Sequence, residues 1–389
     1  MFIRSAKKVL KKVEECDICV FGAGMAGREI VDYLTNYGVN ILCIYDNDEY
    51  LYNKKILGVP IRKPDENMDK DIIYVISVSE EYRNDICDQL ETMGIVKEKQ
   101  VIYSPWRDYD YMKSLDESEY KDEISARFLE CIGYDMNWDN PQTYNEIINW
   151  EKLYNRDERK VMLADKVLAR EWVKNKIGDK YVINQFGVWE SADIIDFDYL
   201  PQRFVLKTNN GSGRNIIVTD VDKLDISKTV AELDAWLKKD FFTVCLEWQY
   251  KNIYPQIICE ELLDTKNDDF YDLKVYCFRG EPEYIHCIKD EHEETMRARF
   301  YSTNWEVLDF NHCYPDDERI IDKPNCLDEL LEKTMVLCKD FDHVRVDWYL
   351  LPNKTFLFSE MTFSSWGGVE KFRPAKYDLL LGEMIRGEK

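Results

Sequence analysis

Basic residues are too few and histidines too rare in this 389-residue chain for several classes of function. The chain has 52 Lys and Arg against 75 Asp and Glu, so its formal net charge at pH 7 is −23. Nucleic acid and anionic membrane surfaces would be repelled, which argues against both as partners. The four histidines show no metal-ligand spacing, and no Ser–His–Asp or Cys–His arrangement can be argued.

Long apolar runs and paired cysteines are also missing. No window approaches about 18 apolar residues and the N-terminus lacks the apolar core of a signal peptide, so we expect a cytoplasmic protein with no integral membrane segment. The 12 cysteines are scattered, as suits a reducing compartment. Cys16 and Cys19 form a C-x-x-C, but strand alternation would point them to opposite faces, so we expect no metal there.

What is present is enough apolar sequence for two or three domains, since hydrophobic residues make up 45% of the chain. Residues 1–104 alternate between strand and helix patterns and predict a doubly wound α/β unit. The charged and aromatic residues 105–139 predict a helical linker, and residues 140–389 a second compact region. In the first unit we expect strands at Ile18–Gly22, Asn40–Tyr45, Ile72–Val78 and Gln100–Tyr103, and helices at Ala26–Tyr37 and Glu81–Met93.

A glycine pattern lies between the first of these strands and the first helix. Gly22, Gly24 and Gly27 have G-x-G-x-x-G spacing, and Asp46 ends the next strand, where an acidic residue would accept a ribose hydroxyl. The stretches "FGAGMAGREIVDYL", "YDND" and "LGVPI" resemble the Rossmann-like module of sugar-nucleotide enzymes, which implies a nucleotide or nucleotide-sugar ligand. The alternative is that the glycines only pack a strand–helix turn and bind nothing.

A second glycine loop occurs in "FVLKTNNGSGRNIIVTD". A strand ending in Lys207, a loop containing Gly211, Ser212 and Gly213, and a returning strand predict a flap whose amides cover a triphosphate. Lys207 would neutralise phosphate oxygens. The loop is not a Walker motif, because neither G-K-[ST] nor a helix follows it.

Two carboxylates occupy strand-like segments joined by a "PNK" turn. Asp347 and Glu360 would face each other across the predicted hairpin, and hard oxygen ligands beside a triphosphate suit Mg²⁺, with two ions bridged by Glu360. Arg345 shares a strand face with Asp347 and would clamp the γ-phosphate or a substrate carboxylate. Lys274 would also touch phosphate, and residues 364–374 are a candidate substrate loop.

From Asn140 onward the chain resembles the TupA-like ATP-grasp family of cell-surface polysaccharide biosynthesis, through "NPQTYNEIINWEKLYNRD", "ADKVLAREWV", "FVLKTNNGSGRNII", "DLKVYCFRGEPEYI" and "HVRVDWYLLPNKTFLFSEMTF". The resemblance implies an α/β and α+β chain, with a Rossmann-like domain before an ATP-grasp domain. It divides the latter into a flap subdomain (about 180–260) and a carboxylate-bearing subdomain (about 260–389).

The same resemblance implies roles for individual residues. Lys166 and Lys207 are the two ATP-phosphate lysines, and a hinge contacts adenine and ribose through Glu260, Glu261 and Leu262. Two positions depart from a known pattern, the first from that of ATP-grasp enzymes in general, as the resembling family allows, and the second from that of the resembling family itself. Thr362 stands two residues after the metal glutamate, where ATP-grasp enzymes usually have asparagine, and Ile147 stands where a lysine is expected.

These features together predict an ATP- and Mg²⁺-dependent ligase that activates a carboxylate as an acylphosphate and joins it to an amine, on a small-molecule or glycan substrate. Two alternatives remain open. One is a kinase-like phosphotransferase on a glycan or nucleotide-sugar, and the other is a non-catalytic nucleotide-sugar-binding scaffold, which Thr362 and Ile147 would favour.

Overall fold

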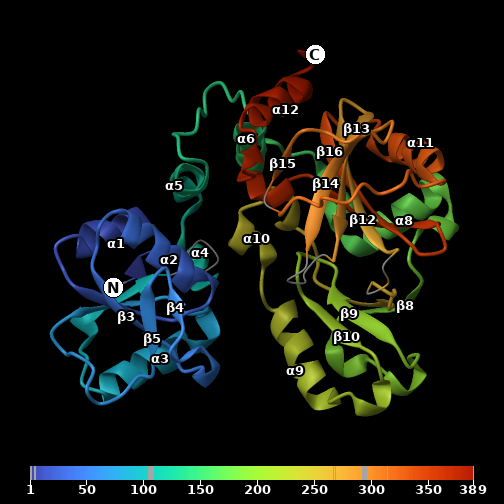
Figure 1. Ribbon diagram of the computed structural model, residues 1–389. Coiled ribbons are helices and arrows are strands. Elements are labelled where there is room, and N and C mark those ends of the chain that lie inside the picture. Colours follow the sequence, from blue (N-terminus) through green and yellow to red (C-terminus); the bar gives the residue numbers. More distant parts are fainter. Residues whose placement is uncertain are drawn as a thin grey trace. The chain divides into compact units, whose positions relative to one another are not determined.

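The computed structural model describes residues 2–3, 6–103, 109–265, 267, 269–290, 296–312 and 314–388. The chain forms two compact units, Met1–Tyr134 and Asp135–Lys389 (Figure 1). Within the described residues, no helix has both the length and the apolar character needed to cross a membrane.

The first unit is built around a seven-stranded sheet in the order β1-β7-β6-β2-β3-β5-β4. All its strand pairs are parallel except β4 with β5. From β2 the chain builds β3 and β5 on one side and then returns to build β6 and β7 on the other. The strands are β1 (Phe2–Ile3), β2 (Ile18–Phe21), β3 (Ile41–Tyr45), β4 (Lys55–Ile56), β5 (Val59–Arg62), β6 (Ile73–Ile76) and β7 (Gln100–Tyr103).

Helices cover both faces of this sheet. α1 (Ala6–Val13) and α2 (Met25–Asn36) pack against Val20 and Val75, whereas α3 (Glu80–Thr92) packs against Phe21 and Tyr74 on the other face. Because the central strands are buried on both faces, their sequences are nearly continuous apolar runs. These runs made it possible to predict the strands from the sequence. The predicted strands and helices of this unit are confirmed to within about two residues. Its assignment as a Rossmann-like, doubly wound nucleotide module stays a prediction.

The stretch predicted as a helical linker contains two α-helices where it is described. The two helices are α4 (Tyr109–Ser114) and α5 (Tyr120–Ile132). Between them, Asp116 and Glu119 form a capping box that starts a new helical segment leading into α5. Gly133, with φ of +96°, then ends α5 in the left-handed conformation that glycine tolerates.

The described part of the second unit contains two large antiparallel sheets and a two-stranded one, β15 with β18. The smaller of the two large sheets has the order β10-β9-β11-β8 and packs on α9 (Ile226–Leu237) through Leu233. The larger has the order β14-β13-β12-β16-β17. The strands are β8 (Gln185–Trp189), β9 (Phe204–Thr208), β10 (Asn215–Val218), β11 (Ile257–Glu261), β12 (Tyr271–Phe278), β13 (Glu281–Lys289), β14 (Arg297–Ser302), β16 (His343–Leu350) and β17 (Phe356–Thr362).

Helices also cover both faces of the larger sheet (Figure 1). α8 (Lys166–Ile177) and α11 (Leu327–Cys338) share a core with Val275, Val346 and Trp348. On the other face, α6 and α12 pack against Tyr276 and Phe278. The remaining elements are α6 (Tyr144–Tyr154), α7 (Glu158–Ala164), α10 (Phe241–Cys245), α12 (Lys376–Arg386) and the short pair β15 (Asn311–His312) and β18 (Phe372–Arg373).

Ile147, the position at which a lysine was expected, is a residue of α6 that faces the core. It is 8% exposed and belongs to the same apolar cluster as Tyr276 and Leu381. A lysine here would carry its charge into that cluster, so the isoleucine suits the packing of this chain.

The glycine turn after β2 is tightly packed at two of its three glycines. Gly22 has φ of +109°, and a Cβ there would lie 2.3 Å from the Ser77 carbonyl oxygen. A Cβ at Gly27 would lie 1.9 Å from the carbonyl oxygen of Gly22, whereas a Cβ at Gly24 would meet nothing within 4 Å. Packing alone therefore requires glycine at positions 22 and 27.

We predict that Gly27→Ala destabilises the first unit by about 3 kcal/mol, because the added methyl group collides with backbone rather than with a movable side chain. Gly24→Ala is the matched control and should change the stability by less than about 1 kcal/mol, because alanine is a poorer N-cap for α2 than glycine but loses less entropy on folding. Denaturant unfolding of both variants measures the difference. Equal stabilities would contradict the collision.

Candidate functional site

Three neighbouring strands of the larger sheet place the predicted metal and phosphate residues side by side. Asp347 on β16 pairs directly with Glu360 on β17 and with Lys274 on β12. Arg345 pairs with Thr362 in the same hairpin. The predicted hairpin and the facing of its two carboxylates are therefore confirmed, while the roles of these residues stay predictions.

Arg345 connects the two acids. Its Nε and one terminal nitrogen donate to the two carboxylate oxygens of Asp347, each at 2.7 Å, in a bidentate ion pair. The same terminal nitrogen lies 3.7 Å from Glu360 Oε1 and donates to Thr362 Oγ1 at 3.1 Å. Lys274 Nζ lies 3.8 Å from Asp347 Oδ2. In this structure Arg345 holds the carboxylates in place, and its contact with phosphate or substrate remains a prediction.

The two carboxylates differ in environment. Burial raises the pKa of Asp347, although Arg345 and Lys274 oppose the shift. Burial would also raise the pKa of Glu360, but Lys166, Arg345 and Lys274 together lower it. The side chain of Glu360 is 36% exposed against 6% for Asp347, so Glu360 is the more accessible anionic donor.

Thr362 supports Glu360 and is not turned away from it. Its hydroxyl donates to Glu360 Oε1 at 3.1 Å. Among the described residues, no three of His, Cys, Asp and Glu gather into a metal-holding group. Mg²⁺ commonly takes only one or two carboxylates together with water and substrate phosphates. Two facing carboxylates therefore fit that ion, with Asp347 and Glu360 as the protein donors and Thr362 beside them.

The predicted flap is an antiparallel hairpin. β9 ends at Lys207 and Thr208 and pairs with β10 across the glycine loop. Gly211 has φ of +91°, and a Cβ there would lie 2.5 Å from the ring of Phe241, so this position requires glycine. Ser212 and Gly213 are exposed at the tip. The strand–loop–strand prediction is confirmed.

Lys207 forms an ion pair with Glu260 on the neighbouring strand β11. The two side chains are 17% and 10% exposed, so the charges lie mostly out of water. The next residue, Glu261, is exposed, and its N–H donates to the Asn184 carbonyl oxygen at 2.9 Å. The N–H of Glu261 is therefore already used, and the contacts of Glu260, Glu261 and Leu262 with adenine and ribose stay predictions.

Lys166 joins the flap to the carboxylate hairpin. Its ammonium donates to the carbonyl oxygen of Gly211 in the flap. Burial lowers the pKa of Lys166, the charge of Lys207 lowers it further, and Glu360 and Glu260 oppose the shift. These charges act on one ammonium, so residues almost 200 positions apart form one electrostatic neighbourhood.

The start of α8 is fastened to the same loop. Asp165 caps the helix by accepting from the Val167 N–H at 2.8 Å, and its other oxygen accepts from Asn209 Nδ2 at 3.0 Å. The N–H of Lys166 donates to the Asn209 carbonyl oxygen at 3.1 Å. Asn209 is fully buried and also bonds Gln256 through its side chain. This fastening sets the direction in which Lys166 points.

Asp46 and the N-terminal glycines belong to the first unit. Asp46 accepts from the N–H of Ala23 at 2.7 Å and from the N–H of Asp48 at 2.8 Å. Its carboxylate thus stabilises the glycine turn itself, which supports the alternative in which the turn is structural. Ligand binding by Gly22, Gly24, Gly27 and Asp46 stays a prediction.

A buried polar network behind the hairpin was not found from the sequence. Arg345 donates to Ser365 Oγ at 2.7 Å, and the Tyr276 hydroxyl lies 3.0 Å from His312 Nε2. His312 Nε2 in turn lies 3.7 Å from Glu370. Burial raises the pKa of Glu370 to about 7 and lowers that of His312 to about 3, so His312 is neutral near pH 7. The only sequence signal was an acidic residue after the paired glycines.

Two family profiles match the chain. The profile described as TupA-like ATPgrasp matches residues 146–386, more than half of the chain. The profile described as C2185-like, N-terminal, matches residues 14–102. No curated protein matches the chain.

Solved structures resemble the chain only weakly. An L-amino acid ligase from Bacillus licheniformis has 11% identity and a TM-score of 0.37, with 96% of this chain and 75% of that chain covered. The D-alanine–D-alanine ligase from Bacillus anthracis, complexed with ATP, has 13% identity and a TM-score of 0.36, with 96% and 98% covered. The N5-carboxyaminoimidazole synthetase from Staphylococcus aureus, complexed with ADP, has 13% identity and a TM-score of 0.32, with 90% and 70% covered. Scores this low carry no argument about activity.

We predict a pH dependence of stability from Glu370, which is 1% exposed. The folded protein keeps its proton up to a pKa of about 7, above the ordinary value of 4.5, so this group's contribution to stability falls as pH rises through that window. Wild type should lose on the order of 2 kcal/mol more than Glu370→Gln between pH 5 and pH 8.

Denaturant unfolding at the two pH values measures this difference. Asp378, whose pKa burial raises to about 6, titrates in both proteins, and its charge raises the pKa of Glu370, so the difference reports Glu370 together with its coupling to Asp378. Parallel pH profiles of wild type and variant would refute the prediction.

Proposed function

Because the chain belongs to the TupA-like ATP-grasp family, we propose that it is an ATP-dependent ligase that joins a carboxylate to an amine. The observation that carries the proposal is that Lys166 donates to the Gly211 carbonyl oxygen of the glycine flap, in which Lys207 pairs with Glu260, while the charge of Glu360 acts on the same ammonium. Cations beside exposed glycine amides on one side and two carboxylates on the other suit a triphosphate with its magnesium ions.

The chain's own residues account for binding and orientation of ATP. Lys207 and Lys166 neutralise phosphate oxygens under the tip of the glycine flap, and the end of β11 receives the base and ribose. Asp347 and Glu360 would hold Mg²⁺, which would supply positive charge to offset the charge that moves with the γ-phosphoryl group. Arg345 keeps both carboxylates aligned, so little rearrangement is needed as the reaction proceeds.

The reaction itself needs no protein nucleophile. A substrate carboxylate oxygen attacks the γ-phosphorus and the bond from that phosphorus to the β-phosphate oxygen breaks. ADP departs, and the substrate becomes an acylphosphate. An amine then attacks the acyl carbon, phosphate departs with the bonding electrons, and an amide remains. Positioning and electrostatic stabilisation supply most of the rate.

We assign the substrate to cell-surface polysaccharide or glycan synthesis in the cytoplasm. In this proposal a sugar acid and an amino acid or other amine are joined, and the first unit holds the nucleotide handle of the substrate. Product analysis separates a ligase from a phosphotransferase on the same fold. A ligase releases ADP only when carboxylate and amine are both present, whereas a kinase releases it with a hydroxyl acceptor alone.

We predict that Lys207→Ala weakens ATP binding in the presence of Mg²⁺ by at least about tenfold, because it removes a charge-assisted contact to phosphate. The shift in melting temperature on titration with ATP and Mg²⁺ measures the change. Lys223→Ala is the matched control, since that lysine is 83% exposed in the same subdomain. A normal shift in the Lys207 variant, or none in wild type, would count against the proposal.

We predict that Glu360→Gln raises the Mg²⁺ concentration needed for half-maximal ADP release by about tenfold or more, because one anionic oxygen donor is lost. Glu281→Gln, at an exposed position of β13, is the control and should behave as wild type. The apo melting temperature of each variant shows whether folding is intact. An unchanged Mg²⁺ requirement would remove Glu360 from the metal site.

A further inference from the structure

The segment after the carboxylate hairpin contains three consecutive residues in the left-handed backbone region. Trp366 has φ of +48°, Gly367 of +60° and Gly368 of +68°. Glycine adopts this conformation without cost, but a bulky side chain does so only under constraint. Such outliers persist where the surroundings impose them, and they concentrate at functional sites.

A polar stripe on α6 imposes this conformation. Asn149 Nδ2 donates to the Gly368 carbonyl oxygen at 2.6 Å, and Lys152 Nζ donates to that of Gly367 at 2.5 Å. Asn145 exchanges two hydrogen bonds of 2.8 Å with the backbone of Glu370. These stripe residues follow i, i+4, i+7 spacing on one helix face and are at most 3% exposed.

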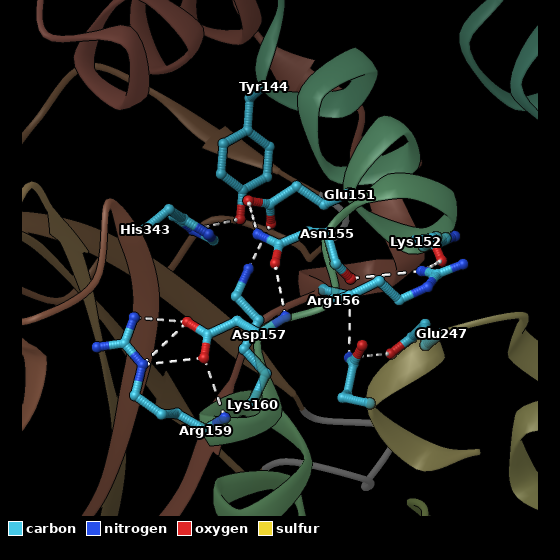
Figure 2. A network of polar contacts seen from close by, with 12 residues as sticks. Tyr144, Glu151, Lys152, Asn155, Arg156, Asp157, Arg159, Lys160, Glu247 and His343 are labelled. Carbon is cyan, nitrogen blue, oxygen red and sulfur yellow. Dashed lines mark hydrogen bonds and ion pairs between the residues drawn. The ribbon is translucent and has the colours of Figure 1, made fainter. Parts of the chain in front are cut away.

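α6 is itself held at both ends, as Figure 2 shows. Near its start, the Tyr144 hydroxyl lies 3.1 Å from His343 Nε2 on β16. Near its end, Glu151 accepts from Lys160 Nζ of α7 at 2.9 Å. The stripe therefore projects from a fixed helix, and it can hold the segment against the strain at Trp366.

The constrained segment begins at the candidate site. Ser365 Oγ accepts from Arg345 at 2.7 Å, and Ser364 Oγ accepts from Gln249 at 3.1 Å. Trp366 follows directly and is 43% exposed, whereas Ser365 is fully buried. The rings of Trp366 and Tyr314 pack edge to face, with 5.4 Å between their centroids. A large indole, whose ring lies against His312 and Tyr314, is thus held partly in solvent beside the hairpin at a left-handed backbone position.

We propose that Trp366 binds the acceptor substrate by stacking on the apolar face of a sugar ring, and that Asn145, Asn149 and Lys152 are positioning residues that hold it there. That the acceptor is a sugar acid rests on the proposed function. An indole offers a rigid apolar plane at low entropic cost, and ligand sites commonly combine such planes with a few polar groups. Arg373, which donates to the Tyr314 carbonyl oxygen at 2.7 Å, supplies a cation near this aromatic pair for the carboxylate.

Trp366→Gly tests the inference, because glycine removes the indole and also relieves the left-handed strain. If the indole serves substrate binding, this variant keeps or gains melting temperature while its affinity for sugar acids falls by about tenfold. Trp366→Phe retains an aromatic plane and should recover much of that affinity. Lys354→Gly is the matched control, since Lys354 is exposed with φ of +64° at the far turn of the same hairpin and should change stability without changing binding.

Binding of glucuronic and galacturonic acid is measured by saturation-transfer NMR, and ATP binding with Mg²⁺ is measured separately by thermal shift. Loss of sugar-acid binding in Trp366→Gly, with ATP binding and melting temperature kept, supports the inference. A lowered melting temperature in that variant, unchanged sugar-acid binding, or no sugar-acid binding in wild type overturns it. Failure of the proposed function is distinguished because it appears as absent ATP binding in wild type.

The stripe is tested with Asn149→Ala and Lys152→Met. A positioning role predicts weaker sugar-acid binding with ATP affinity kept, together with faster amide hydrogen exchange at Gly367 and Glu370. A merely structural role predicts that ATP and sugar-acid binding decline in parallel with stability. That result would remove the stripe from substrate positioning.

Discussion

The ion pair between Arg345 and Asp347 is the interaction on which the candidate site depends. Both side chains are at most 7% exposed, and burying two charges costs several kcal/mol each unless geometry and hydrogen bonds compensate. Here the pairing is bidentate, and the remaining guanidinium donors reach Ser365 and Thr362. One arginine thereby sets the orientation of Asp347 and Glu360 on one side and of the constrained segment on the other.

This arrangement explains how a threonine fits a position that usually holds asparagine. Thr362 donates its hydroxyl proton to Glu360 and accepts from Arg345. Thr362 therefore connects Arg345 to Glu360 through its hydroxyl group, so that the arginine also orients this carboxylate. A hydroxyl committed in this way is a weak metal ligand, so Thr362 would add little to an ion held by Asp347 and Glu360.

The sequence predicted those parts of the structure that depend on local pattern. The β16–β17 hairpin follows from two apolar strands around a Pro-Asn-Lys turn, and strand alternation places Arg345 and Asp347 on one face. The flap follows from its glycines. The polar network around Glu370 and the stripe on α6 could not be predicted, because Asn145 and Glu370 are 225 residues apart and neither lies in a pattern that names its partner.

In the first unit, a pattern was visible in the sequence but its role could not be predicted from it. The G-x-G-x-x-G spacing was visible in the sequence, but the spacing is equally compatible with a turn that packs and a turn that binds. Gly22 and Gly27 are explained by backbone contacts, and Asp46 by its bonds to the turn. Only Gly24 is left without such an explanation, so the pattern is weaker evidence of a ligand than its spacing alone suggested.

The attachment of Asn209 to Asp165 and Gln256 has a mechanical consequence for the flap. These hydrogen bonds hold the start of the glycine loop in place. Only the part of the loop that follows Asn209 can therefore move, and its exposed tip is at Ser212 and Gly213. Lys166 is tied to the same loop through the Gly211 carbonyl oxygen. If Lys166 binds phosphate as proposed, its ammonium must give up this hydrogen bond, and nucleotide binding would then loosen the glycine loop.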